Sequence, residues 1–83
     1  MDYIKAVTFP DHTNWGFSFS HVEKNGMRGK SKAEYASEKE AVSALIKTIC
    51  AIYPTKRIFI NTRGNSAAWG LNVPKNVTIK QGI

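Results

Sequence analysis

The side chains of this chain that could support catalysis are its carboxylates, histidines and cysteine. The chain has six carboxylates, two histidines and one cysteine, all within its first 50 residues. None of them has the spacing of a metal site, such as Cys-x-x-Cys or His-x-x-x-His, so we expect no metal and no cofactor. His12 could act in a metal-independent nuclease, but only with a second base that the sequence does not supply. We therefore expect a protein that is not an enzyme.

The single cysteine is informative about the cellular compartment of the protein. Cys50 has no partner within the chain, so a reducing cytoplasm is the expected environment and Cys50 is expected to be a small core residue. The first residues lack the basic and apolar regions of a signal peptide. No stretch approaches the roughly 18 apolar residues of a membrane span. These observations predict a cytoplasmic protein that does not contact a membrane.

Positive charge is the chain's other chemical feature, because the net charge is +6. Residues 1–40 contain equal numbers of basic and acidic side chains, whereas no carboxylate side chain follows Glu40. The uncompensated cations of the second half are Lys47, Lys56, Arg57, Arg63, Lys75 and Lys80. A field of this kind attracts polyanions and speeds their association. Solubility alone is the other interpretation of this excess.

A second group of cations precedes that excess. Arg28, Lys30 and Lys32 occupy every second position of one segment. In a strand, their side chains would project on one side, roughly 7 Å apart. Charges on an edge strand also deter edge-to-edge aggregation, so the row has both a structural and a ligand-binding interpretation.

The elements that must position these cations begin with an antiparallel meander. A first strand is predicted over residues 3–9 and is expected to end at Pro10. Residues 15–22 then alternate between two faces, one of which carries Trp15, Phe17, Phe19 and His21. The Asn25-Gly26 pair favours a tight hairpin turn into a third strand over residues 27–35.

A helix is predicted next. Ser37 and Glu40 have the spacing of a capping box, and Tyr53-Pro54 ends the helical pattern. The apolar residues at helical spacing are Val42, Leu45, Ile46, Ile49 and Ile52. Such a helix is expected to lie across a sheet.

The remaining residues predict one more strand and several short elements. The apolar run at 57–62 indicates a buried strand, parallel to an earlier one. Residues 63–66 indicate a loop whose amides could also bind a phosphate, residues 67–70 a single helical turn, and residues 77–80 a short closing strand. The prediction is one α+β domain over residues 1–83.

The order strand, strand, strand, helix, strand resembles the front half of the ribonuclease H fold. It is also similar to the shortened version of that fold in HicB-type antitoxins. Ribonuclease H enzymes hold two divalent metals with acids on the first strand, on the helix and at the end of the next strand. Here Glu40 is the helix acid, the first strand has no acid before Pro10, and Arg63 stands near the third position. The resemblance therefore implies the fold without its metal-dependent chemistry.

Cations and one tryptophan make up the predicted binding site. Its residues are Arg28, Lys30, Lys32, Lys56, Arg57, Arg63, Trp69, Lys75 and Lys80. Single-stranded nucleic acids need cations along a surface and aromatic rings for stacking. We expect Trp69 to be exposed and Trp15 to belong to the core, and contact with the phosphate backbone to matter more than base readout. The predicted function is a small antitoxin-like or inhibitor-like regulatory protein that binds nucleic acid, with RNA favoured.

A protein-interaction module is the alternative interpretation. Such a domain would inhibit a host enzyme or a toxin, such as a nuclease, with or without RNA, as small phage proteins do. A homodimer through sheet edges or through Trp69 is also compatible with the small core. A metal-independent nuclease is the least favoured of the three functions.

Overall fold

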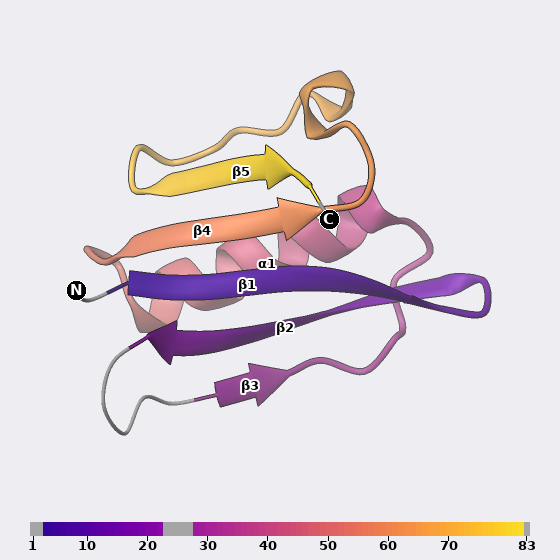
Figure 1. Ribbon diagram of the computed structural model, residues 1–83, viewed down its shortest axis with the longest axis horizontal. Helices are drawn as coiled ribbons and strands as arrows, with labels where there is room; N and C mark the ends of the chain where they lie inside the picture. The colour runs from indigo at the N-terminus through magenta and orange to yellow at the C-terminus, as the bar shows by residue number, and fades with distance from the viewer. Residues whose placement is uncertain (1–2, 23–27, 83) are drawn as a thin grey trace.

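The computed structural model describes residues 3–22 and 28–82, which form a sheet with a helix on one side (Figure 1). The elements are β1 (Tyr3–Asp11), β2 (Asn14–Val22), β3 (Arg28–Lys30), α1 (Glu38–Ile52), β4 (Arg57–Thr62), the 3₁₀ turn η1 (Ser66–Trp69) and β5 (Val77–Gln81). The α+β class and the strand-helix-strand order are as predicted. The predicted Asn25-Gly26 turn lies outside the described residues.

The five strands form one mixed sheet in the order β3-β2-β1-β4-β5. β1 and β3 are antiparallel to β2, whereas β4 is parallel to both β1 and β5. Parallel neighbours need a crossover connection, and α1 supplies the one that brings the chain to β4. Figure 1 shows α1 behind the sheet and no element in front of it. The helix therefore covers only one face.

The core lies between α1 and that covered face. In β1 and β4, alternate residues point toward the helix, so Ile4, Ala6, Ile58 and Ile60 are almost completely buried. The predicted apolar residues of α1 meet them, except Ile52, which is 46% exposed at the last position of the helix. Among the described residues, no helix is long and apolar enough to cross a membrane.

β1 continues past Pro10 to Asp11, so the predicted end of this strand was wrong. β4 pairs with β1 only as far as Val7, and beyond it β1 has one neighbour. Pro10 pairs with Trp15, whose own amide bonds to Tyr35 on the other side. Pro10 therefore lies at a position where no hydrogen bond to β2 is made, and its missing N–H costs nothing.

The predicted strand over residues 27–35 is also wrong in its length. β3 ends at Lys30, and the chain then touches β2 again through Ser31 and through a single bridge between Trp15 and Tyr35. From the pair Lys30–Ser18 to the bridge Tyr35–Trp15, the chain after β3 advances by five residues and β2 by only three. The chain therefore bulges over residues 32–34. Lys32 is consequently not in one strand row with Arg28 and Lys30.

β4 has the predicted bounds but is not buried on both sides. Ile58, Ile60 and Thr62 are buried, whereas Phe59 between them is 39% exposed. The apolar run suggested a strand covered on two faces. Because α1, the one α-helix of the described residues, lies on one face, the other face of β4 meets solvent.

Candidate functional site

The face of the sheet opposite α1, called the open face from here on, is defined by the strand register. Directly paired residues have side chains on the same side of a sheet. Lys5 pairs with Ser20 of β2 and with Phe59 of β4, and Val7 pairs with Ser18 and Asn61. These odd-numbered positions of β1 alternate with the buried Ile4 and Ala6, so they face away from the helix.

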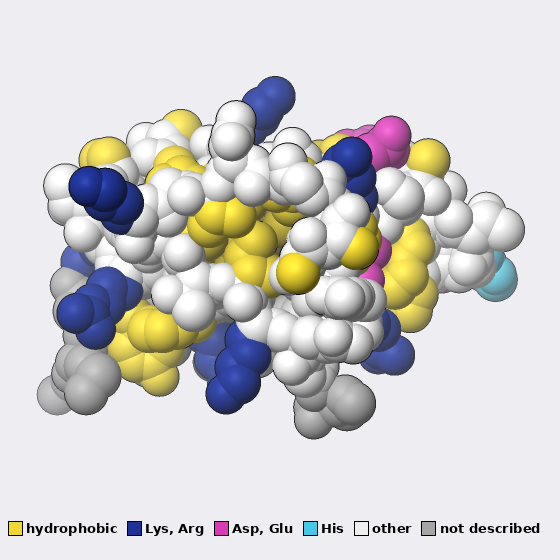
Figure 2. Space-filling view, turned by 90° about the horizontal axis from the view of Figure 1, so that it is seen from above, with side chains coloured by type: hydrophobic (Ala, Val, Ile, Leu, Met, Phe, Trp, Pro, Cys, Tyr) yellow, Lys and Arg dark blue, Asp and Glu magenta, His cyan; other side chains and the backbone are white. Residues whose placement is uncertain are grey.

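Among the described residues, five exposed cations lie on the open face. They are Lys5 of β1, Arg28 and Lys30 of β3, Arg57 of β4 and Lys80 of β5. Within the described chain, none of the five forms a salt bridge. Asp11, at the β1–β2 hairpin tip, also occupies an open-face position, and its Oδ1 lies 3.6 Å from His12 Nε2. In Figure 2, Lys and Arg side chains recur along the lower margin, which is the side of the open face. Among the described residues, none of these five positive charges is therefore neutralised by a salt bridge.

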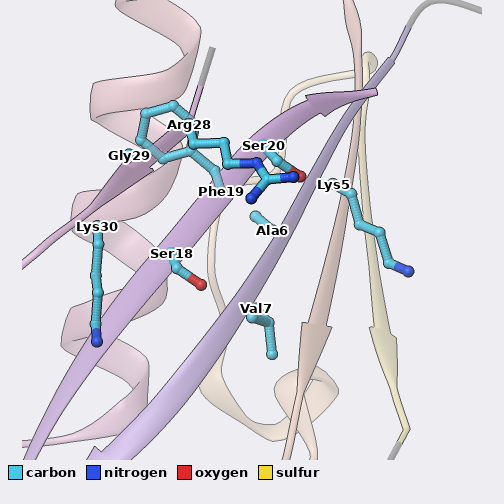
Figure 3. Close-up of a pocket in the computed structure, with 9 residues that line it drawn as sticks. All are labelled: Lys5, Ala6, Val7, Ser18, Phe19, Ser20, Arg28, Gly29 and Lys30. Atoms are coloured by element: carbon cyan, nitrogen blue, oxygen red, sulfur yellow. The ribbon is translucent and has the colours of Figure 1, made fainter. Parts of the chain in front are cut away.

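A shallow depression runs across β1, β2 and β3 on this face (Figure 3). Arg28, Lys30 and Lys5 line it, together with the hydroxyl-bearing Ser18 and Ser20. Figure 3 shows the Arg28 guanidinium extended over β2, on the side of its pairing partner Ser20. Cationic and hydroxyl groups are both donors to phosphate oxygens, so the chemistry of this depression suits a phosphate group.

Aromatic rings lie between these cations. The rings of Tyr3 and Phe59 meet edge to face with centroids 5.3 Å apart. Phe9 lies over Gly16, where an added Cβ would be only 2.6 Å from the Phe9 ring, and Lys30 Nζ is 4.9 Å from the Phe9 centroid. The open face thus combines cations with aromatic surface, although none of these rings was among the site residues predicted from the sequence.

Two further predicted cations flank the open face. Arg63 lines a depression with Asn61 and Lys80 at the carboxyl end of β4. Lys75 lines another with Arg57 and Thr78 at the opposite end of that strand. The structure therefore places six of the nine predicted site residues on or beside this face: Arg28, Lys30, Arg57, Arg63, Lys75 and Lys80.

The other three predicted residues lie elsewhere. Lys32 is in the bulge after β3, and Lys56 is half-buried in the turn before β4. Trp69, predicted to be exposed, is half-buried against the core, with Gly64 beneath its ring. Lys5 was not predicted as a site residue, because a count of charges over residues 1–40 balances its charge against the acids. The alternation of buried and exposed positions along β1 was the signal that could have identified it.

A buried carboxylate connects β1, α1 and the loop after β4. Glu38, in the first turn of α1, is 7% exposed, and its carboxylate accepts hydrogen bonds from Thr8 Oγ1 at 2.6 Å and from the Arg63 and Gly64 amides at 2.7 Å each. The loop amides that were predicted to bind a phosphate are therefore engaged by this carboxylate. Glu40 has the capping role expected of it, since it accepts a hydrogen bond from the Ala36 amide and its own amide donates one to Ser37 Oγ.

The described residues contain no group of three or more His, Cys, Asp or Glu side chains that could hold a metal ion. Comparisons with protein-family models, with curated proteins and with solved structures gave no match. The open face is therefore the feature from which a function can be inferred.

Proposed function

We propose that this protein is a non-catalytic nucleic-acid-binding domain of the cytoplasm, with RNA as the favoured ligand, and that it binds through the open face. The observation that carries this proposal is the set of five exposed cations contributed by four strands, none of which is in a salt bridge within the described chain. Such a surface gains free energy by releasing counterions from a phosphate backbone.

The spacing of the cations favours a polymer over a small anion. Neighbouring strands lie about 4.8 Å apart, so Arg28 on β3 and Lys80 on β5 are separated by four spacings, or roughly 19 Å. One phosphate ion cannot contact both. A chain of phosphates that crosses the strands can meet Arg28, Lys5 and Lys80 in turn.

The resemblance to a shortened ribonuclease H fold supports a regulatory role of the antitoxin or inhibitor kind. The parallel pairing of β1 with β4 agrees with it. Thr8 of β1 and the amides of Arg63 and Gly64, directly after β4, all donate hydrogen bonds to Glu38 of α1. These three hydrogen bonds give the Glu38 carboxylate a structural role, which supports binding without metal-dependent cleavage.

The proposal is tested by measuring the affinity for a labelled RNA at about 50 and about 200 mM salt by fluorescence anisotropy. We expect log K to fall with log salt by about 0.7 for each phosphate contact. The double variant Arg28→Gln/Lys30→Gln should lower the affinity and reduce this slope by about 1.4. Lys39→Gln/Lys47→Gln, which removes two exposed cations from α1, is the matched control and should leave the slope unchanged. Equal losses in the two double variants, or no binding at the lower salt, would contradict the proposal.

Inhibition of a protein partner is the second candidate function. β5 pairs only with β4 among the described residues, so its outer edge can accept a strand from another chain. The partner would be a nuclease or a toxin, and a homodimer through the same edge is an alternative use of it. Chain–chain association that persists at high salt, without affinity for RNA at low salt, would favour this function.

A further inference from the structure

We infer that the nucleic acid on the open face is single-stranded and that one of its unpaired bases stacks on Phe59. This inference rests on the proposed function and specifies the ligand. Its starting point is that the ring of Phe59, on β4, is exposed on the cationic open face. Phe59 lies between Lys5 of β1 and Thr78 of β5.

Phe59 has the environment of a stacking platform. Its side chain is on the solvent side of the sheet and is 39% exposed. The edge-to-face contact with Tyr3, with a 90° angle between the rings, restrains the orientation of Phe59 on one side. A restrained, exposed ring loses little conformational entropy when a base covers it, and such stacking contributes about 1–3 kcal/mol per base.

The groups around Phe59 match the remaining parts of a nucleotide. Tyr3, Lys5, Phe59 and Asn61 line one common depression. The Asn61 amide has both a donor and an acceptor for the edge of a base, and the Lys5 ammonium is a partner for the adjoining phosphate. Lys80 pairs with Asn61 from β5 and extends the cationic path.

A double-stranded RNA has no unpaired base to stack on Phe59. In double-stranded RNA the bases are stacked inside, and proteins contact mainly its phosphates and 2′-hydroxyls. Phe59 and Val7, 39% and 45% exposed, would then face a polar backbone. A single strand with splayed bases satisfies both the cations and the apolar groups, and sheet modules of this kind stack two or three bases.

A second copy of the chain does not suit the open face either. Two such faces placed together would oppose five cations with five cations, and like charges across an interface are unfavourable. Charge complementarity therefore selects a polyanion as the occupant.

The test compares one single-stranded RNA with the duplex of the same sequence. We expect Phe59→Ala to weaken single-strand binding by about 5- to 150-fold, to change duplex binding by less than about 2-fold, and to leave the salt slope unchanged because no phosphate contact is lost. Phe59→Trp should retain or strengthen single-strand binding. Ile52→Ala, which removes an apolar side chain of similar exposure (46%) from the end of α1, is the matched control and should have no effect.

Circular dichroism establishes that each variant is folded, and Phe59→Leu replaces Phe59→Ala if the alanine variant is not. Wild-type protein that binds duplex and single strand equally, with no effect of Phe59→Ala or Phe59→Leu, would overturn this inference and leave the proposed function intact. Wild-type protein that binds neither RNA at about 50 mM salt would overturn the proposed function as well.

Discussion

The hydroxyl of Thr8, in β1, donates a hydrogen bond of 2.6 Å to the carboxylate of Glu38, which lies in the first turn of α1. The same carboxylate accepts hydrogen bonds from the backbone amides of Arg63 and Gly64, directly after β4. One side chain therefore joins the first strand, the helix and the loop after the parallel strand. Hydrogen bonds to an ionised acceptor are stronger than neutral ones, so this junction stabilises the packing of α1 on the sheet.

Replacement of Glu38 tests this junction. Glu38→Ala leaves one hydroxyl and two amides without their acceptor, and we expect the free energy of unfolding to fall by about 3 kcal/mol. Urea unfolding followed by circular dichroism measures this change. Glu34→Ala removes an exposed carboxylate and should cost no more than about 0.5 kcal/mol. Similar losses for the two variants would mean that the junction is not stabilising.

The Thr8 hydroxyl can be removed with little change in shape. Thr8→Val keeps the two amide donors to Glu38 and should lower the free energy of unfolding by about 1–2 kcal/mol. Thr78→Val makes the same change at an exposed position of β5 and serves as the control. The interpretation fails if Thr8→Val is as stable as the wild-type protein.

Gly16 is expected to tolerate no side chain as long as Phe9 is present. A Cβ at residue 16 would lie 2.6 Å from Phe9 Cζ, so Gly16→Ala should destabilise the protein by about 1–3 kcal/mol. In a Phe9→Ala background the same substitution should cost much less, and a double-mutant cycle measures the difference. Gly82→Ala, where the added atom meets nothing within 4 Å, is the control. Equal costs in both backgrounds would show that the ring is not the obstacle.

The two sides of β4 should respond differently to truncation. Ile60 is 1% exposed and faces α1, so Ile60→Ala should cost about 3 kcal/mol of unfolding free energy. Phe59→Ala, on the open face, should cost less than half of that, although Phe59 is the larger residue. Thermal and urea unfolding of the two variants measure the comparison. A larger loss for Phe59→Ala would contradict the assignment of the open face.

The sequence predicted best those elements that local signals define. The capping box at Ser37 and the break at Tyr53-Pro54 set α1, and the apolar run at 57–62 set the bounds of β4. The end of β3 was not predictable in this way. It depends on hydrogen bonds between Ser31 and Phe17, including one from the Phe17 amide to the Ser31 hydroxyl, which involve a second strand.

The cations of the candidate site could be selected from the composition, but their arrangement in space could not. An excess of cations indicated a polyanion, and most of those selected lie on or beside the open face. Lys5 and Phe59 could not be assigned to the site without the register, because these two residues are 54 positions apart in the chain and lie on different strands. Trp69 looked like a loop residue, yet the 3₁₀ turn and the small Gly64 allow it to pack against the core.

Because α1 covers only one face of the sheet, alternate residues of the same strand are under different constraints. In β1 and β4, one set of alternate residues holds the helix and the other set meets solvent. Substitutions in the solvent-facing set change charge and stacking surface while the helix-facing set is untouched. The ligand preference proposed for the open face can therefore diverge, or be redesigned, at a smaller cost in folding stability than large-to-small changes in the core.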